Sequence, residues 1–367
     1  MPKFKILIPG FILVCFALIV PGCGEDDVPV KQQDPVVVEK EYGAFVVCAG
    51  NDQYPPERYL GYYDIKNDSF RLNILAQGQL PQSPNTLHYS DGVLFCPISS
   101  EYYPTNQMMF KLGAWGETKG STLMQIYTNH KISSSLVFGN YLAISYLPGD
   151  PLEGGTLEIR NKFSYDWLYR HNETRSRIAA MEYYNNRLFL LLTGYNNTGV
   201  DSSLAALKPF EAGLSKVSLR DKPSGIVLTQ DGMLVIACSG SSNMVYHVDP
   251  ETLVKTDSSA LSGGFANRLR IYKENSLVFY ISKNDKIMKY VPATRTSTVF
   301  LNNDLAADGY TISGYNIDQY TGKLYVLYAN INTYKPGKMR IYSSSGFFER
   351  MIITGKTPVD VVIAKQE

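Results

Sequence analysis

The chain has 367 residues, of which 44% are hydrophobic, 19% charged and 12% aromatic. This length and composition fit a globular protein with a large core, and they exclude a disordered chain, a collagen-like chain and a protein with several membrane spans. Lys plus Arg number 35 against 34 for Asp plus Glu, a balance that does not favour binding to nucleic acid.

The N-terminus predicts a secretory signal. Two lysines precede an uncharged, mostly apolar run over residues 6–20, which is too short to span a bilayer comfortably. Gly22 directly precedes Cys23, as lipoprotein processing requires, although Pro21 departs from the usual motif. We therefore predict a lipoprotein signal peptide over residues 1–22 and lipidation of Cys23; a plain signal peptide with ordinary secretion is the alternative.

Residues 23–41 are expected to be a lipidated cysteine and a flexible tether. An acidic cluster at Glu25, Asp26 and Asp27 follows Cys23, and the remaining residues show no hydrophobic periodicity. This arrangement resembles the surface-export signal of lipoproteins in Gram-negative bacteria. The resemblance implies a protein that is lipid-anchored in the outer membrane and exposed at the cell surface.

Three cysteines remain in the predicted folded region. Cys48, Cys96 and Cys238 each lie in an apolar run, which favours buried free thiols over a disulfide framework. A bridge between Cys48 and Cys96 stays open as an alternative if their strands lie in adjacent sheets.

A repeat of about 46 residues runs through the rest of the chain. A tight-turn residue, a variable residue, a leucine and two apolar residues recur six times. The leucines are Leu94, Leu142, Leu188, Leu234, Leu277 and Leu324, spaced 48, 46, 46, 43 and 47 residues apart. Each unit has a short apolar stretch before the turn and a second pair of strand-like segments after it. Four strands in about 46 residues are typical of a β-propeller blade.

The ends of this region complement each other. Residues 43–47 match the second strand of a unit that lacks a first strand, and residues 357–364 match a first strand with nothing after it. We predict an all-β fold in which residues 42–367 form a single seven-bladed β-propeller with four-stranded blades. The C-terminal strand would join the first blade and close the ring. An array of two-sheet sandwiches and a β-helix are the alternatives.

Motifs for metal, phosphate or nucleophilic chemistry are not recognisable. The four histidines are widely spaced, and the chain lacks a phosphate-binding loop and a Gly-x-Ser-x-Gly elbow. Residues 302–304 with Asp308 form at most a partial calcium loop. We therefore predict no metal, no cofactor and no catalytic residue. A propeller hydrolase, which would combine carboxylates from different blades, stays an alternative.

The predicted loops differ between the two ends of the blades. The turns after the first strands are minimal, as at Asp91–Gly92 and Asn185–Asn186, whereas the loops at the other, upper face are longer and rich in Tyr and Asn. Long loops of this composition are typical of recognition surfaces. The candidate ligand-binding residues are Asn51, Tyr54, Arg58, Tyr102, Tyr103, Tyr146, Arg177, Tyr195, Asn196, Arg268, Asn332 and Tyr334.

The opening blade resembles a known group. The run Gly43-Ala-Phe-Val-Val-Cys-Ala-Gly50-Asn51, followed by Gly61-Tyr-Tyr-Asp64, is similar to YncE-like propeller lipoproteins on the surface of Gram-negative bacteria. Some members of that group capture corrinoids and sit on a TonB-dependent transporter. The resemblance implies a non-enzymatic, lipid-anchored surface protein that captures a corrinoid-like solute for such a transporter; a glycan-binding or protein-interaction scaffold is the alternative.

Overall fold

The computed structural model describes residues 42–50, 57–74, 86–98, 107–112, 118–124, 131–147, 155–172, 176–194 and 202–365. They belong to one compact unit, Lys40–Glu367. The predicted signal peptide, Cys23 and the tether lie outside the described residues. Within the described residues, no helix has the length and hydrophobicity needed to cross a membrane.

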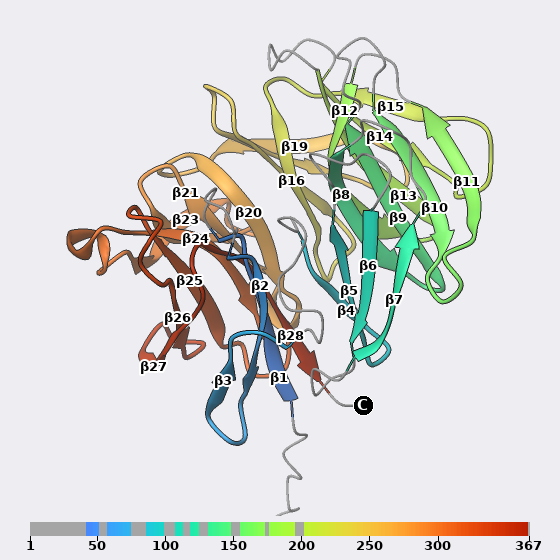
Figure 1. Ribbon diagram of the computed structural model, residues 1–367. Helices are drawn as coiled ribbons and strands as arrows, with labels where there is room; N and C mark the ends of the chain where they lie inside the picture. Colours follow the sequence, from blue (N-terminus) through green and yellow to red (C-terminus); the bar gives the residue numbers. More distant parts are fainter. Residues whose placement is uncertain are drawn as a thin grey trace, which may run out of the picture. The chain divides into compact units, whose positions relative to one another are not determined.

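The described strands form seven four-stranded antiparallel sheets (Figure 1). The first sheet contains, in spatial order, β28 (Pro358–Lys365), β1 (Tyr42–Cys48), β2 (Tyr59–Asp64) and β3 (Ser69–Arg71). The second contains β4 (His88–Ser90), β5 (Val93–Ile98), β6 (Gln107–Leu112) and β7 (Thr118–Met124). The third contains β8 (Lys131–Phe138), β9 (Tyr141–Leu147), β10 (Thr156–Asn161) and β11 (Trp167–Asn172).

The other four sheets each follow the order of the sequence. They are β12 (Ser176–Tyr184), β13 (Arg187–Gly194), β14 (Ser203–Leu207) and β15 (Ser215–Ser218); then β16 (Pro223–Leu228), β17 (Leu234–Cys238), β18 (Met244–Val248) and β19 (Lys255–Ala260). Next come β20 (Phe265–Tyr272), β21 (Leu277–Ser282), β22 (Lys286–Val291) and β23 (Thr296–Asn302); and β24 (Tyr310–Ile317), β25 (Leu324–Asn330), β26 (Lys338–Tyr342) and β27 (Phe348–Ile353). Two single 3₁₀ turns, η1 (Lys273–Asn275) and η2 (Ala306–Asp308), precede β21 and β24.

The prediction of an all-β propeller with four-stranded blades is confirmed by this arrangement. β28, the last strand of the chain, pairs with β1, the first, over a register that runs from Tyr42 opposite Lys365 to Cys48 opposite Pro358. First strands of consecutive sheets contact each other, and β28 contacts both β24 and β4. The C-terminal strand therefore supplies the innermost strand of the first sheet.

The hydrophobic core lies between neighbouring sheets. Strand β13 shows how the sequence produces this: Leu188, Leu190 and Leu192 pack toward the β8–β11 sheet, whereas Phe189 and Leu191 pack toward the β16–β19 sheet. Side chains alternate between the two faces of a strand, and both faces of this strand are covered. An unbroken apolar run, not an alternating one, is what such a strand requires.

The first turns have the predicted conformation. Asn185 and Asn186 have φ of 47° and 58°, and Asp91 and Gly92 have φ of 49° and 71°. Left-handed values at both central residues are characteristic of the type I′ turn, which matches the twist of a two-strand hairpin and favours Asn and Gly. The short turn sequences therefore fix the register between the first and second strands.

Most tyrosines that the structure describes contribute to the core. Eight of the largest fully buried side chains are tyrosines, and several of their hydroxyls reach polar partners. The Tyr328 hydroxyl lies 2.9 Å from that of Tyr342, and the Tyr290 hydroxyl lies 2.7 Å from His247 Nε2. A buried Tyr needs such a partner for its polar end, so the high Tyr content largely reflects packing.

The innermost strand of each sheet has one edge without a strand partner, and in some sheets polar side chains bond backbone atoms at this edge. Ser133 Oγ donates to the carbonyl of Ile178 at 3.0 Å, and Ser313 Oγ donates to the carbonyl of Pro358 at 2.6 Å. Both serines are the extra residue of a β-bulge in their strand. Ser224 is the corresponding bulge residue of β16, but its hydroxyl is buried without a hydrogen-bond partner.

Substituting the bulge serines tests this role. We expect Ser313→Ala to lower the free energy of unfolding by about 1 kcal/mol, because the Pro358 carbonyl loses its donor. Ser224→Ala is the matched control and should leave stability unchanged or slightly raised, because its hydroxyl has no partner to lose. Urea denaturation of both variants measures the difference, and equal stabilities would contradict the proposed role of the Ser313 hydroxyl.

Candidate functional site

Seven of the predicted site residues lie outside the described residues. They are Cys23, Asn51, Tyr54, Tyr102, Tyr103, Tyr195 and Asn196. Arg58, Tyr146, Arg177, Arg268, Asn332 and Tyr334 belong to the described part of the chain.

Tyr146 requires a correction. It lies in β9, is 1% exposed, and directs its hydroxyl toward Glu158 Oε2 at 3.4 Å. Glu158 in turn is held by Arg160 and Arg170, with contacts of 2.7 and 2.6 Å. The loop begins later along the chain than the sequence pattern indicates, so Tyr146 belongs to the core and not to a recognition surface.

Asn332 and Tyr334 lie together in the loop that follows β25. The Tyr334 amide donates to Asn332 Oδ1 at 3.1 Å, and the Asn332 amide donates to Asn330 Oδ1 at 2.9 Å. The Tyr334 ring remains 57% exposed. The turn is thus held by side-chain amides, which leave an aromatic ring in contact with solvent.

Arg58 is half-buried immediately before β2. Its neighbour Glu57 forms an ion pair with Lys356, a residue of the segment that leads into β28. The amide of Gly50 also donates to the Lys356 carbonyl at 3.1 Å. These contacts fasten the segment before β28 to the loop between β1 and β2.

Arg268 belongs to a buried ionic cluster around Asp360. Asp360, in β28, is 1% exposed; its Oδ1 lies 3.3 Å from Arg268 Nη1 and 3.8 Å from Arg270 Nη2. Its Oδ2 accepts the amide of Leu87 at 3.0 Å. Arg268 Nη2 also donates to the carbonyl of Val359 at 2.6 Å. One carboxylate therefore connects β28, β20 and the segment before β4.

The backbone of Arg268 explains how its side chain reaches β28. Its φ is 55°, a left-handed value that is uncommon for a residue other than glycine. It lies in an irregular part of β20, between Asn267 and Arg270, where the register shifts. The Tyr315 hydroxyl holds the Arg268 carbonyl at 2.9 Å. This local distortion turns the arginine away from its own sheet and toward Asp360.

His88 and Ser135 lie beside this cluster and share a hydrogen bond of 2.8 Å between Nε2 and Oγ. A Ser–His contact is the arrangement that nucleophilic catalysis uses. Desolvation of the enclosed imidazole lowers the pKa of His88 to about 4, although Asp360 counteracts part of this effect. Ser135 is 6% exposed and also contacts the Thr86 hydroxyl at 2.9 Å. A weak base beside an enclosed serine fits a structural hydrogen-bond network.

Arg177 and Lys222 form a second cationic feature, at points where first strands begin. Arg177 faces Thr193 across β12 and β13, and Thr193 Oγ1 donates to the carbonyl of Pro223 at 2.8 Å. Lys222 directly precedes Pro223. Burial and the charge of Arg177 both lower the pKa of Lys222. Within the described segments, neither cation has a carboxylate partner, and Arg177 Nε is buried without a hydrogen bond.

The three described cysteines are buried free thiols. Burial raises the pKa of Cys48 and Cys238 to about 12 and that of Cys96 still further. A protonated, enclosed thiol is a poor nucleophile. These residues therefore act as small apolar core side chains.

No group of three or more His, Cys, Asp or Glu side chains suited to a metal ion occurs among the described residues. In the segment considered for calcium, Arg340 Nη1 donates to Asp304 Oδ1 at 2.7 Å. Asn303 donates to Asp285 and to the carbonyl of Tyr310. An arginine thus occupies the carboxylate that a calcium ion would need.

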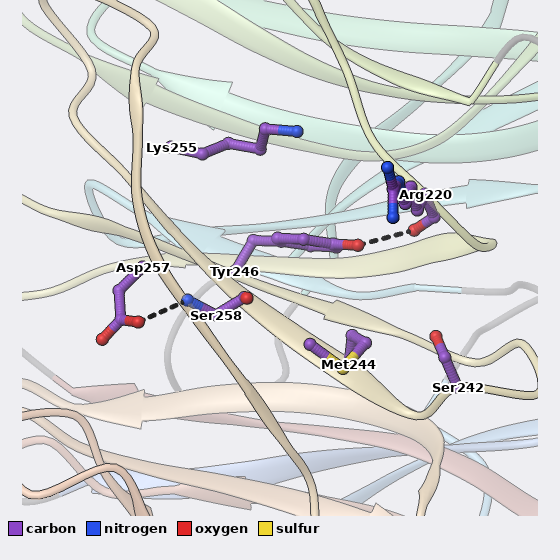
Figure 2. A pocket seen from close by; sticks show the side chains of 7 residues that line it. All are labelled: Arg220, Ser242, Met244, Tyr246, Lys255, Asp257 and Ser258. Carbon is purple, nitrogen blue, oxygen red and sulfur yellow. Dashed lines mark hydrogen bonds between the residues drawn. The ribbon is translucent and has the colours of Figure 1, made fainter.

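A lateral pocket of about 540 Å³ lies along β18 and β19 (Figure 2). Tyr246 and Met244 line it from β18, Lys255 lines it from β19, and Arg220 borders it from the segment before β16. None of these residues was selected from the sequence. The 46-residue repeat predicts where the strands lie. It does not predict which side chains of different strands line a common pocket, because these residues do not recur at a fixed spacing in the sequence.

The importance of Asp360 can be tested by removing its charge. We expect Asp360→Ala to lower the free energy of unfolding by about 3–5 kcal/mol, because Arg268 and Arg270 lose the carboxylate that compensates them. Glu349→Ala is the control, since Glu349 pairs with Lys323 at the surface, and surface pairs contribute little. Guanidinium denaturation gives both values. Equal losses in the two variants would show that the Asp360 cluster is not a stabilising centre.

The low pKa of His88 predicts a pH-dependent stability. The unfolded imidazole binds protons below about pH 6.5, whereas the folded one does so only near pH 4. The stabilisation is complete above pH 6.5 and is lost as the pH falls toward 4. From pH 7.5 to 5, His88 should therefore account for a loss of about 2 kcal/mol.

The His88→Gln variant measures this contribution, because glutamine does not titrate. Its free energy of unfolding should fall less between pH 7.5 and 5 than that of the unmodified chain. The same pH dependence in both proteins would contradict the assignment. The variant is compared with itself across pH, so a uniform loss of stability does not affect the result.

No family model and no curated protein matches the sequence, but solved structures show the same fold. A quinoprotein alcohol dehydrogenase-like protein from Bacteroides thetaiotaomicron superposes with a TM-score of 0.62 at 13% identity, covering 89% of this chain and 79% of that one. The periplasmic gluconolactonase PpgL of Pseudomonas aeruginosa gives 0.62 at 13% identity, covering 88% and 99%. The Cps50 (Swd1) β-propeller domain of Myceliophteria thermophila gives 0.55 at 11%, covering 76% and 89%.

These three structures share the β-propeller architecture, but their names describe proteins of different kinds. At such low identity the likeness concerns the fold, and function has to be argued from the residues of each site. By sheet organisation and by these comparisons, the chain has the β-propeller fold.

Proposed function

We propose that this chain is a non-enzymatic, lipid-anchored binding protein at the cell surface, where it captures a solute for a TonB-dependent outer-membrane transporter. The anchor would be Cys23, and the ligand would bind at the ends of the sheets where the first strands begin. We further infer that the seven sheets are the blades of one closed propeller, which would form a rigid support for the loops.

The observation that carries this proposal is the Arg177–Lys222 pair. Two like charges that lie close enough to affect each other, without a carboxylate among the described residues, disfavour the folded state unless something else compensates them. A ligand that presents a phosphate, carboxylate or amide oxygen would supply that compensation. The hydrogen bond from Thr193 to Pro223 joins β13 to the first residue of β16, and Arg177 and Lys222 lie next to these two residues.

A corrinoid fits this chemistry, because amide side chains surround its macrocycle and cobalamin carries a phosphodiester. The exposed ring of Tyr334 and the amide of Asn332 offer the kind of contacts that such a ligand accepts. The alternative is a scaffold that binds a glycan or a protein through the same loops.

Titration calorimetry of the full-length chain with cyanocobalamin and a panel of glycans tests the proposal. We expect corrinoid binding that the double variant Arg177→Gln/Lys222→Gln weakens at least tenfold, a change of about 1.4 kcal/mol. The control is Lys216→Gln/Lys289→Gln, which removes the same charge from other strands and should bind as the unmodified chain does.

Each other result has a definite meaning. Heat with a glycan alone would favour the scaffold function, and full corrinoid affinity in the double variant would overturn the assigned site. Hydrolysis of a sugar lactone by the purified chain would contradict the non-enzymatic proposal. That reaction is relevant because a structural neighbour is named as a gluconolactonase.

A further inference from the structure

The lateral pocket along β18 and β19 has a floor that is apolar and fixed. Tyr246 is 6% exposed, and its hydroxyl donates to the carbonyl of Arg220 at 3.2 Å. Met244 continues the same strand and borders the same space (Figure 2). The ring is fixed at one end by the backbone of β18 and at the other by the hydrogen bond of its hydroxyl. The floor is therefore preformed in the absence of a ligand.

Two cations border this floor. Lys255 Nζ lies 5.8 Å from the centroid of the Tyr246 ring and donates to the carbonyl of Ser218 at 3.2 Å. In Figure 2, the Nζ end of Lys255 extends in the direction of Arg220. Arg220 is exposed, and no hydrogen bond or ion pair engages its guanidinium among the described residues. Its donors are therefore available to a ligand.

The acids near the pocket do not neutralise these cations. Asp257 forms an ion pair with Arg295, which does not line the pocket. Asp221 accepts hydrogen bonds from the amide and hydroxyl of Ser242, and the charge of Lys283 also acts on it. Each acid is matched by a cation outside the pocket, so Arg220 and Lys255 leave the pocket with a net positive charge.

The pocket also contains hydrogen-bond acceptors. Asp257 Oδ1 accepts the amide of Ser258 at 2.7 Å and keeps further lone pairs. The hydroxyls of Ser242 and Ser258 border the same space. A simple inorganic anion has no hydroxyl donors for these acceptors, whereas the hydroxyls of a sugar can donate hydrogen bonds to them.

We propose that this lateral pocket binds a uronate residue of an acidic saccharide. The carboxylate would pair with the forked guanidinium of Arg220 and with Lys255, an arrangement that planar Arg donors favour. The apolar face of the sugar would lie on Tyr246 and Met244, and its hydroxyls would bond Asp257 and Ser258. A volume of about 540 Å³ falls in the range of small-ligand sites.

This site is independent of the one proposed for solute capture. It lies along β18, β19 and the segment before β16, and it shares no residue with the Arg177–Lys222 pair. A second site of this kind would let the protein hold an acidic polysaccharide while its loops bind another ligand.

Calorimetry of the full-length chain with digalacturonate tests the proposal, with neutral α-1,4-galactobiose as the matched ligand without carboxylates. We expect digalacturonate to bind more tightly than galactobiose, and Arg220→Gln and Lys255→Gln each to weaken it about tenfold. Lys216→Gln, an equal change of charge outside the pocket lining, should leave the affinity unchanged. The Arg177→Gln/Lys222→Gln variant should also bind digalacturonate normally.

Three results would overturn the proposal. They are equal affinity for both disaccharides, unchanged affinity in Arg220→Gln, and complete displacement of digalacturonate by an equal concentration of inorganic sulfate, which would indicate a site for bare anions. Melting temperatures show whether each variant is folded. If Arg220→Gln is not folded, Lys255→Gln provides the same comparison, since the Lys255 ammonium makes only one hydrogen bond, to the Ser218 carbonyl, and lies near the Tyr246 ring.

Discussion

The constraint on which this structure depends is the unpaired inner edge of each first strand. A strand edge carries a row of backbone donors and acceptors that need partners. Here the partners come from neighbouring sheets, because Ser133, Thr193 and Ser313 donate to carbonyls of the next innermost strand. The hydrophobic clusters between sheets and these hydrogen bonds connect the same pairs of adjacent sheets. Packing and edge hydrogen bonding therefore stabilise the arrangement of the sheets together.

The Asp360 cluster extends this principle from hydrogen bonds to charges. The backbone of Arg268 departs from regular β geometry, with φ of 55°. Its side chain connects β20 to β28 through Val359 and Asp360. The cluster lies beside His88 and Ser135, which by residue type alone would attract a catalytic interpretation. Their enclosure and the low pKa of His88 favour a stabilising role, as a buried polar network with most members paired stiffens the fold around it.

Charges that remain without partners point to ligands more directly than this cluster does. The Arg177–Lys222 pair lies where first strands begin; Lys255 lies on the outermost strand β19, and Arg220 lies in the segment before β16. In each place one cation lies on a strand, Arg177 on β12 and Lys255 on β19, and its partner lies in the short segment before β16. Preformed sites of this kind lose little entropy on binding, which is why we propose both for recognition.

The sequence by itself determined the strand architecture. Leucines at a spacing near 46 residues marked the second strands. Residues 357–364 without a following strand predicted the strand that pairs with β1, because apolar periodicity and turn residues act locally.

Only the tertiary structure decided which polar residues meet. Tyr146 belongs to the core although its neighbours look like a loop, Arg268 reaches Asp360 from another sheet, and Arg220 lies beside Tyr246 although 26 residues separate them. Contacts between sheets depend on how strands twist and where bulges turn a side chain, and a repeat pattern contains no information on either.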